Sequence, residues 1–132
     1  MHDVLYIPEA VVASILAHAA SDAPREACGL LVGGGSAVTR AVATPNSDAS
    51  ATRYSIPPDR HFAAIRDART AGLDVVGAYH SHPRGPAEPS PTDTAEAFAD
   101  FVFVIAGLEP RPHVRAWQLL DGNFVELRLV RT

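Results

Sequence analysis

Tyr79-His80-Ser81-His82-Pro83 is the stretch around which this chain is organised, and Ser90-Pro91-Thr92-Asp93 follows shortly after it. The apolar run directly before this stretch predicts a buried strand. If the strand continues to His82, the side chains of His80 and His82 share one face, with Cα atoms about 6.6 Å apart. That separation lets two imidazoles approach one metal ion. Pro83 has no backbone N–H and ends the strand, so we expect the pair at the open end of the sheet.

The Ser90–Asp93 segment has the chemistry of a helix N-terminus. Ser90 suits the N-cap, Pro91 the first helical position, and an acidic residue favours the positive end of the helix dipole. Capping alone would explain the segment, but a helix that starts here can fold back and place Asp93 beside both imidazoles. Two neutral imidazoles and one carboxylate form a catalytic zinc set with the fourth position open. The capping and metal-binding roles are compatible.

Two segments carry a resemblance to a known family. His80-Ser81-His82, seven residues, Ser90, two residues and Asp93 resembles the H-x-H-x7-S-x2-D signature of JAMM/MPN+ metalloproteases. The segment 26–33, Glu-Ala-Cys-Gly-Leu-Leu-Val-Gly, resembles the upstream E-x-C-G-x-x-x-G segment of that family. The likeness covers nearly the whole chain, including Asn46 and the 53–57 stretch. A match of five residues in the right order and spacing is specific.

The resemblance implies a role for each of these residues. His80, His82 and Asp93 would bind Zn²⁺, Glu26 would be the general base, and Ser90 would help to stabilise a tetrahedral intermediate. Spacing alone could not select Glu26, since Glu9, Glu88 and Glu96 are also available.

Composition sets further bounds on what the chain can be. Its 132 residues predict one domain, with 47% hydrophobic and 20% charged residues. A net charge of -4 without a Lys/Arg cluster argues against nucleic-acid binding. No apolar segment is long enough for a membrane span, and no signal peptide is evident. The single cysteine excludes an internal disulfide, so we expect a cytoplasmic protein.

Helices and strands are expected to alternate between two hairpins. The three glycines at 33–35 predict a hairpin turn rather than a phosphate-binding loop, because no Gly-Lys-Ser/Thr follows them. Two bracketing hairpins imply a mixed sheet. The family resemblance agrees, since it implies an α/β domain with a curved, mixed sheet and about three helices, as in JAMM/MPN and cytidine-deaminase-like folds. The periodicity predicts helices over 8–21, 57–71 and 91–99, and strands over 28–32, 37–42, 53–56, 74–82, 101–106, 113–120 and 124–130.

The remaining candidate residues have ordinary structural explanations. Cys28 lies in an apolar strand, so a small buried hydrophobe is favoured over a nucleophile or a fourth zinc ligand. Trp117 is expected in the core or an interface, and Ser81 should pack on the face opposite the histidine pair. The other histidines lack ligand-like spacing and are expected at the surface or at a sheet edge: His2, His18, His61 and His113.

The resemblance also suggests a substrate. The family cleaves bonds next to the C-terminal Gly-Gly of ubiquitin-like proteins, and compact prokaryotic members act on small sulfur carriers of that fold. A narrow groove at a sheet edge would suit an extended glycine tail, which could add as a strand. Two alternatives stay open, a hydrolase of small amides or peptides without a carrier and a non-catalytic MPN scaffold. The sequence leaves the oligomeric state open, a homodimer included.

Overall fold

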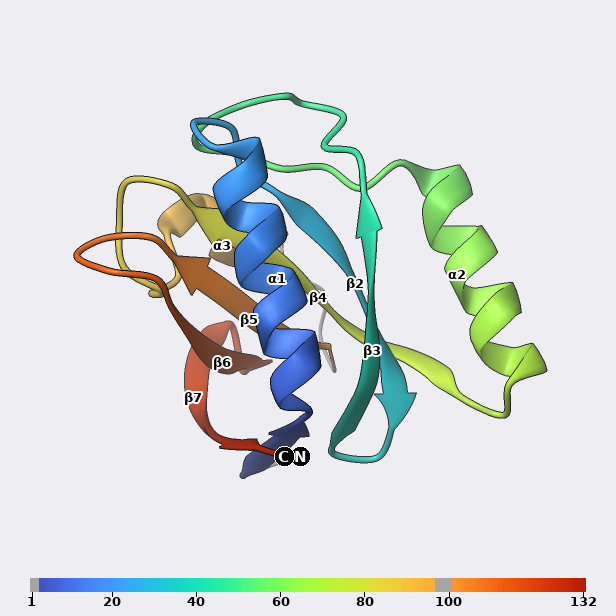
Figure 1. Cartoon of the computed structure of the whole chain (residues 1–132). Helices are drawn as coiled ribbons and strands as arrows, with labels where there is room; N and C mark the ends of the chain where they lie inside the picture. The colour runs from blue at the N-terminus through green and yellow to red at the C-terminus, as the bar shows by residue number, and fades with distance from the viewer. Residues whose placement is uncertain (1–2, 97–100) are drawn as a thin grey trace.

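A single mixed sheet organises the protein, and the computed structural model describes residues 3–96 and 101–132 of it (Figure 1). Its strands follow the order β1-β3-β2-β4-β5-β6-β7, and pairing of β1 with both β3 and β7 closes it into a barrel. The strands are β1 Val4–Ile7, β2 Cys28–Gly34, β3 Ala37–Thr44, β4 Asp74–His82, β5 Val102–Gly107, β6 His113–Leu120 and β7 Asn123–Arg131. The helices are α1 Glu9–Asp22, α2 Pro58–Thr70 and α3 Pro91–Glu96.

Strand β4 lies in the interior of the sheet. It pairs antiparallel with β2, where Cys28 lies opposite His80, and parallel with β5, where His82 lies opposite Gly107. The register against β2 shifts near Gly77. A Cβ on Gly77 would collide with the carbonyl oxygen of Val102, so only glycine lets the two strands approach there. Because β4 pairs with β2 as far as His80 and with β5 as far as His82, its last residues are held in a fixed register.

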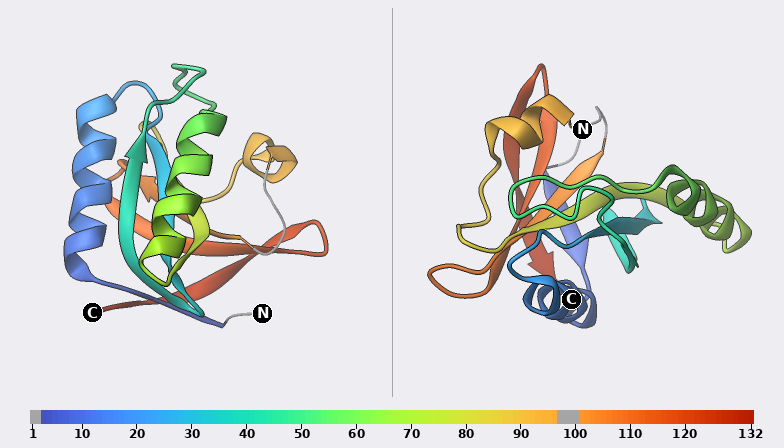
Figure 2. Two further views of the ribbon diagram at one scale, coloured as in Figure 1. Left: turned by 90° about the vertical axis from the view of Figure 1, so that its right-hand side faces the viewer. Right: turned by 90° about the horizontal axis from the view of Figure 1, so that it is seen from above.

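Two apolar cores lie on the two faces of the sheet. The larger one joins α1 to buried side chains from all seven strands, and Tyr79 is its member from β4. The smaller one joins Ala64 of α2 to Ala78 on the other face of β4. Figure 2 shows the two helices against different parts of the sheet, with α3 apart from both. Since side chains alternate along a strand, His80 and His82 share the face of Ala78, and Ser81 shares that of Tyr79.

The predicted mixed α/β architecture with three helices is confirmed, but closure of the sheet was not foreseen. The closing strand β1 has only four residues, and no element was expected there. Its Leu5 and Ile7 are fully buried, so the strand is fixed by packing on the larger core. The third helix is confirmed to Glu96, and its expected end at 99 falls outside the described residues.

The strand expected over 53–56 is wrong. The side chain of Asn46 takes the backbone groups that a strand would pair: its Nδ2 donates to the Arg53 carbonyl at 2.9 Å, and its Oδ1 accepts from the Ser55 N–H at 3.0 Å. The segment is therefore a loop folded around one asparagine. Within the described residues, no helix is long and apolar enough to span a membrane.

Candidate metal centre and active site

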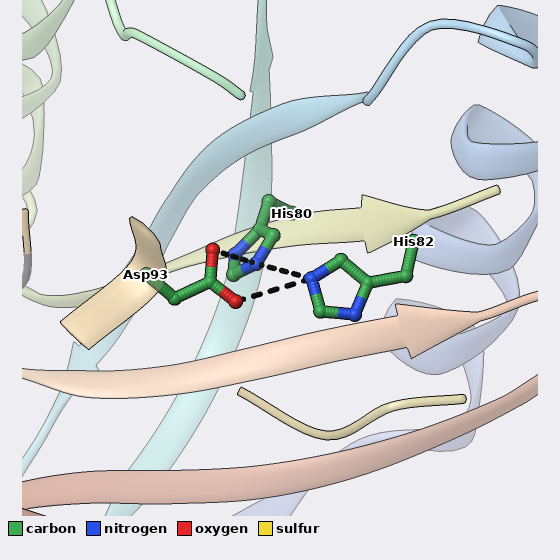
Figure 3. Close-up of side chains that lie close together, drawn as sticks. All are labelled: His80, His82 and Asp93. Atoms are coloured by element: carbon green, nitrogen blue, oxygen red, sulfur yellow. Dashed lines mark hydrogen bonds and ion pairs between the residues drawn. The ribbon is translucent and has the colours of Figure 1, made fainter. Parts of the chain in front are cut away.

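Three side chains from two elements converge at the end of β4 (Figure 3). The Nε2 atom of His80 lies 3.1 Å from Oδ1 of Asp93, and the Nε2 atom of His82 lies 3.1 Å from Oδ2. The two Nε2 atoms are 3.2 Å apart. Each residue thus turns one ligand-type atom toward a common point. The predicted grouping of these three residues is confirmed as geometry.

The donor set and its spacing fit a zinc ion. Two imidazole nitrogens and a carboxylate oxygen are a common zinc set, and atoms bound tetrahedrally at about 2.0–2.1 Å lie about 3.3–3.4 Å apart. The two Nε2 atoms are separated by 3.2 Å, close to that value, and each lies 3.1 Å from a different oxygen of Asp93. Among the residues that the structure describes, no other His, Cys, Asp and Glu side chains gather in this way.

Asp93 is placed by the helix cap that the sequence predicts. The Ser90 hydroxyl oxygen accepts the Asp93 N–H at 3.1 Å, and the Ser90 N–H donates to Asp93 Oδ2 at 2.8 Å. These reciprocal bonds form a capping box. The same carboxylate oxygen also contacts His82, so one aspartate closes the cap and faces the histidines. The two roles expected for the segment coexist.

Each histidine is oriented in a different way. The Nδ1–H of His82 donates to the Pro86 carbonyl at 3.0 Å, which leaves Nε2 with its lone pair toward the site. His80 is 1% exposed, and the ring of Tyr54 stacks on it with centroids 4.5 Å apart and planes 17° apart. Tyr54 comes from the loop that Asn46 organises, so the stacking partner depends on that loop.

Burial and the shared carboxylate set the protonation of the site. Burial lowers the pKa of His80 and favours its neutral, metal-binding form. Burial also acts on His82, but hydrogen bonds to Asp93 and Pro86 outweigh it and raise its pKa. Burial alone would raise the pKa of Asp93, yet the two histidines hold it well below its usual range. The Asp93 carboxylate therefore stays ionised over the pH range in which the two histidines titrate.

Glu26 is held rigidly just before β2. Its N–H donates to the Ser50 carbonyl at 2.7 Å, and its carbonyl accepts from Asn46 Nδ2 at 3.1 Å. The side chain is 3% exposed. Its negative charge helps to raise the pKa of His82, which indicates electrostatic proximity. Backbone anchoring and burial together fix where the carboxylate lies.

A cavity of about 340 Å³ adjoins the metal site, and a separate one of about 390 Å³ lies on β6 and β7. The cavity beside the metal site is lined by Glu26, His82 and Ser90, together with loop residues that include the exposed Arg84. The five residues expected from the sequence are therefore brought together: three converge directly, and the other two share a cavity with His82. A molecule in this cavity would contact Glu26 and Ser90 at once.

Three contributing residues were missed or undervalued in the sequence. Ser81 is more than packing, because its hydroxyl accepts the buried N–H of Ala27, next to Glu26, at 2.8 Å. Tyr54 and Asn46 lie in quoted segments, but nothing in the sequence says that one stacks on His80 and the other supports Glu26. These neighbours are revealed only by the pairing of β2 with β4, which brings Ser81 to Ala27, and by the loop after β3, which brings Asn46 and Tyr54 to the site.

The remaining candidates are resolved in part. Cys28 is fully buried, burial raises the pKa of its thiol, and it is not part of the group formed by His80, His82 and Asp93, as expected for a small hydrophobe. His18 and His113 were expected at the surface or at a sheet edge, and both are half-buried and have polar partners. Nδ1 of His18 lies 2.7 Å from the Tyr79 hydroxyl, and Nε2 of His113 accepts the Ala87 N–H at 3.0 Å. His2 lies outside the described residues.

Several known proteins are similar to this chain in sequence or in fold. The sequence pattern of prokaryotic homologues of the JAB domain matches residues 8–120. A probable TtuB-protein conjugate cleaving protease of Thermus thermophilus is 38% identical over 94% of this chain and 82% of its own. A CysO-cysteine peptidase of Mycobacterium tuberculosis is 33% identical over 93% of this chain and 88% of its own. A solution structure from Desulfitobacterium hafniense superposes with a TM-score of 0.87 at 31% identity, over 97% of this chain and 92% of that one.

These likenesses extend over almost all of the described sheet and its helices, so they concern the whole domain rather than one motif. The resemblance to JAMM/MPN+ proteins expected from the sequence is confirmed. The chain belongs to the family of prokaryotic homologues of the JAB domain.

Proposed function

We propose that this protein is a zinc-dependent peptidase that cleaves the amide bond between the C-terminal glycine of a ubiquitin-like carrier protein and an attached group. The convergence of His80, His82 and Asp93 beside a cavity lined by Glu26 and Ser90 carries this proposal. A zinc ion held there would activate water and polarise the scissile carbonyl.

Glu26 is the general base in this proposal. Its carboxylate would take a proton from the attacking water and return it to the leaving amine, so that no charge accumulates on either. The group is suited to this work because its backbone is anchored on both sides while its side chain lines the cavity.

Ser90 would stabilise the oxyanion that develops on the scissile carbonyl. Its oxygen already accepts the Asp93 N–H, which fixes the hydroxyl position while its own proton can still turn toward a substrate oxygen. Each donor of this kind is typically worth about 10²–10³ in turnover.

An apolar cavity of about 490 Å³ supports docking of a folded carrier. It lies between α2 and the sheet, and its lining includes Tyr54, Phe101 and Phe103. Phe62 of α2, also in the lining, is 70% exposed, which is unusual for a large apolar side chain. Tyr54 both lines this cavity and stacks on His80, so a single ring separates the cavity from that histidine. A carrier seated over α2 would thus direct its tail to the metal.

The sequence suggested that the tail adds as a strand at an exposed sheet edge, but the strand that ends at the metal site, β4, already has β2 and β5 as neighbours. We instead place it in the cavity beside His82, where a Gly-Gly end fits because glycine brings no side chain against the ligands. The relatives named for TtuB-protein conjugates and for CysO-cysteine support a bond between a protein and an attached group. A single amino acid is our preferred leaving group, with cysteine first.

Arg84 supports an amino acid as leaving group. Its side chain is exposed on the lining of the same cavity and makes no ion pair within the described residues. A free amino acid carries an α-carboxylate that a lysine side chain of a protein lacks. A cation at this position would therefore favour a small carboxylate adduct.

The test follows a purified carrier–cysteine conjugate by mass spectrometry. The zinc-loaded protein should release cysteine, and Glu26→Gln should keep about one zinc per chain by elemental analysis while turnover collapses, since an amide cannot take the proton. A tail with its last Gly changed to Val should be cut poorly. His80→Ala and His82→Ala should lose the metal.

Each contrary outcome would overturn a different part of the proposal. Full zinc retention in both histidine variants would exclude this metal site, and zinc loss in Glu26→Gln would make Glu26 a ligand. Cleavage of short peptides but not of the conjugate would favour the carrier-free hydrolase. Zinc binding without any hydrolysis would favour a scaffold. Equal cleavage of Gly and Val tails would remove the argument about the narrow cavity.

A further inference from the structure

One peptide group lies between two histidines in the sheet. His82 of β4, Gly107 of β5 and His113 of β6 are in register across three neighbouring strands. The absence of a side chain at Gly107 leaves room that the backbone of the 83–90 loop fills. A Cβ on Gly107 would lie 2.5 Å from the Ala87 nitrogen, 2.6 Å from the Pro86 carbonyl carbon and 2.7 Å from Cε1 of His113. The Pro86–Ala87 peptide therefore packs against Gly107 of β5, with His82 of β4 and His113 of β6 on either side.

Both ends of this peptide are hydrogen-bonded to imidazoles. Its carbonyl oxygen accepts from Nδ1 of His82 at 3.0 Å, and its N–H donates to Nε2 of His113 at 3.0 Å. Nδ1 of His113 in turn lies 2.7 Å from the Arg111 carbonyl. The result is an unbroken row of donors and acceptors from His82 to Arg111.

The backbone partners fix the tautomers along this row. A backbone N–H can only donate, so Nε2 of His113 must be the acceptor and the proton of His113 must sit on Nδ1, facing the Arg111 carbonyl. A carbonyl can only accept, so Nδ1 of His82 carries a proton, and Nε2, which faces Asp93, is the nitrogen left to bind a metal. Donation of the peptide N–H to His113 also makes the peptide carbonyl a stronger acceptor for His82.

The loop is held on its other side as well. The indole Nε1–H of Trp117 donates to the Ala87 carbonyl at 3.0 Å, so both backbone groups of this fully buried alanine are bonded to β6 side chains. His113 and Trp117 lie on the same face of β6, four residues apart in the strand alternation. The peptide has little freedom to turn while both remain.

We propose that His113 is a positioning residue that fixes the orientation and tautomer of the His82 imidazole through the Pro86–Ala87 peptide. It touches neither the metal site nor the substrate cavity directly. It acts by holding the carbonyl to which His82 donates. The inference rests on the proposed metal site for its effect on affinity, but its effect on the His82 tautomer is independent of any metal.

The test compares three substitutions. His113→Phe keeps a planar ring and removes the acceptor, and His113→Gln restores an acceptor near the position of Nε2. His61→Phe is a matched control for metal binding, because this histidine lies in α2, outside the group of His80, His82 and Asp93, and its ring packs against Phe101. Competition with a chromophoric chelator gives the dissociation constants for Zn²⁺ and Co²⁺, and long-range ¹H–¹⁵N spectra of the metal-free protein near pH 8 report the His82 tautomer.

We expect His113→Phe to weaken metal binding about tenfold, the lower end of the effect of removing a group that orients a histidine ligand. Nδ1 of His82 should be fully protonated in the wild type and only partly protonated in His113→Phe, and His113→Gln should restore both readouts. His61→Phe should match the wild type. If His113→Phe does not fold, Trp117→Phe, which removes the second bond to Ala87, should show the same change in smaller measure.

Two results would overturn the inference. One is a His113→Phe variant that has wild-type metal affinity and in which Nδ1 of His82 stays fully protonated. The other is a His113→Gln variant that is as impaired as His113→Phe, which would indicate a general packing effect. If the wild type binds no metal, the proposed function fails, while the tautomer comparison in the metal-free protein still decides the role of His113.

Discussion

Ser81→Ala tests whether the residue between the two histidines supports the general base. Ser81 lies on the opposite face from His80 and His82, and it holds both backbone groups of Ala27: its hydroxyl accepts the Ala27 N–H at 2.8 Å, and its own N–H donates to the Ala27 carbonyl at 3.0 Å. Alanine keeps the second bond and deletes the first. The Ala27 N–H is then left buried without an acceptor, directly beside Glu26.

The size of the effect follows from that lost acceptor. An unsatisfied buried donor costs about 1–3 kcal/mol. With an unfolding entropy of about 2.1 cal/mol/K per residue over 132 residues, 1 kcal/mol corresponds to about 4 °C, so the Tm should fall by about 4–12 °C. Turnover should fall about tenfold, because a shift of about 1 Å in a reacting group can cost up to about 10². Zinc content should not change, since the ligands themselves are untouched.

Thermal unfolding, zinc analysis and conjugate cleavage measure these three quantities on one preparation. Ser14→Ala is the control, because its hydroxyl donates to the Val11 carbonyl on the exposed side of α1 and Ala is a better helix former. That variant should melt at or slightly above the wild type. The reasoning is refuted if Ser81→Ala melts within about 1 °C of the wild type, or if it loses zinc rather than rate.

Three further predictions concern the site itself. Ser90→Ala should keep zinc and lose only about 1 kcal/mol of stability from the helix cap, while turnover falls about 10² or more because the oxyanion donor is gone; a near-normal rate would leave Ser90 as a cap alone. Zinc affinity should fall as the pH is lowered, and the fall should begin above pH 6.5, because the raised pKa of His82 brings a competing proton onto Nε2 there, whereas the lowered pKa of His80 adds its proton only below 6.5. Calorimetry in buffers of different ionisation enthalpy should detect proton release on zinc binding near pH 7, and the absence of proton release would contradict the assignment. Arg84→Gln should raise KM for a carrier–cysteine conjugate about two- to fivefold, the range of an exposed ion pair, but leave the corresponding cysteine amide unchanged; equal effects on both would exclude carboxylate recognition.

The ligand triad was predictable because each step rests on local chemistry. Alternation along a strand places His80 and His82 on one face, and the cap preference of Ser90 places Asp93 in the first turn of α3. Both patterns span few residues and need no knowledge of neighbouring strands. The order of the elements from α1 to β7 was also readable from periodicity, apart from the strand wrongly expected over 53–56.

The errors arise where distant residues decide the structure. The 53–56 segment has the composition of a strand, but Asn46 takes its backbone groups. The role of His113 depends on its register with Gly107 and His82, which no spacing in the sequence encodes. Strand β1 is too short to show a period, and its burial comes from a core shared with α1.

Closure of the sheet has a consequence for the order of folding. The closing pair sets Val4 beside Arg128, and an ion pair of Glu9 with Arg131 reinforces it at 2.6 Å. A contact between segments so far apart carries the highest loop-closure entropy in the molecule, so we expect it to form after the rate-limiting step. Leu5→Ala should then speed unfolding in stopped-flow chevrons with little change in the refolding rate. A slowed refolding limb would instead place β1 in the folding nucleus. The segments that carry His80, His82 and Asp93 could therefore gather around a metal while the two ends of the chain are still apart.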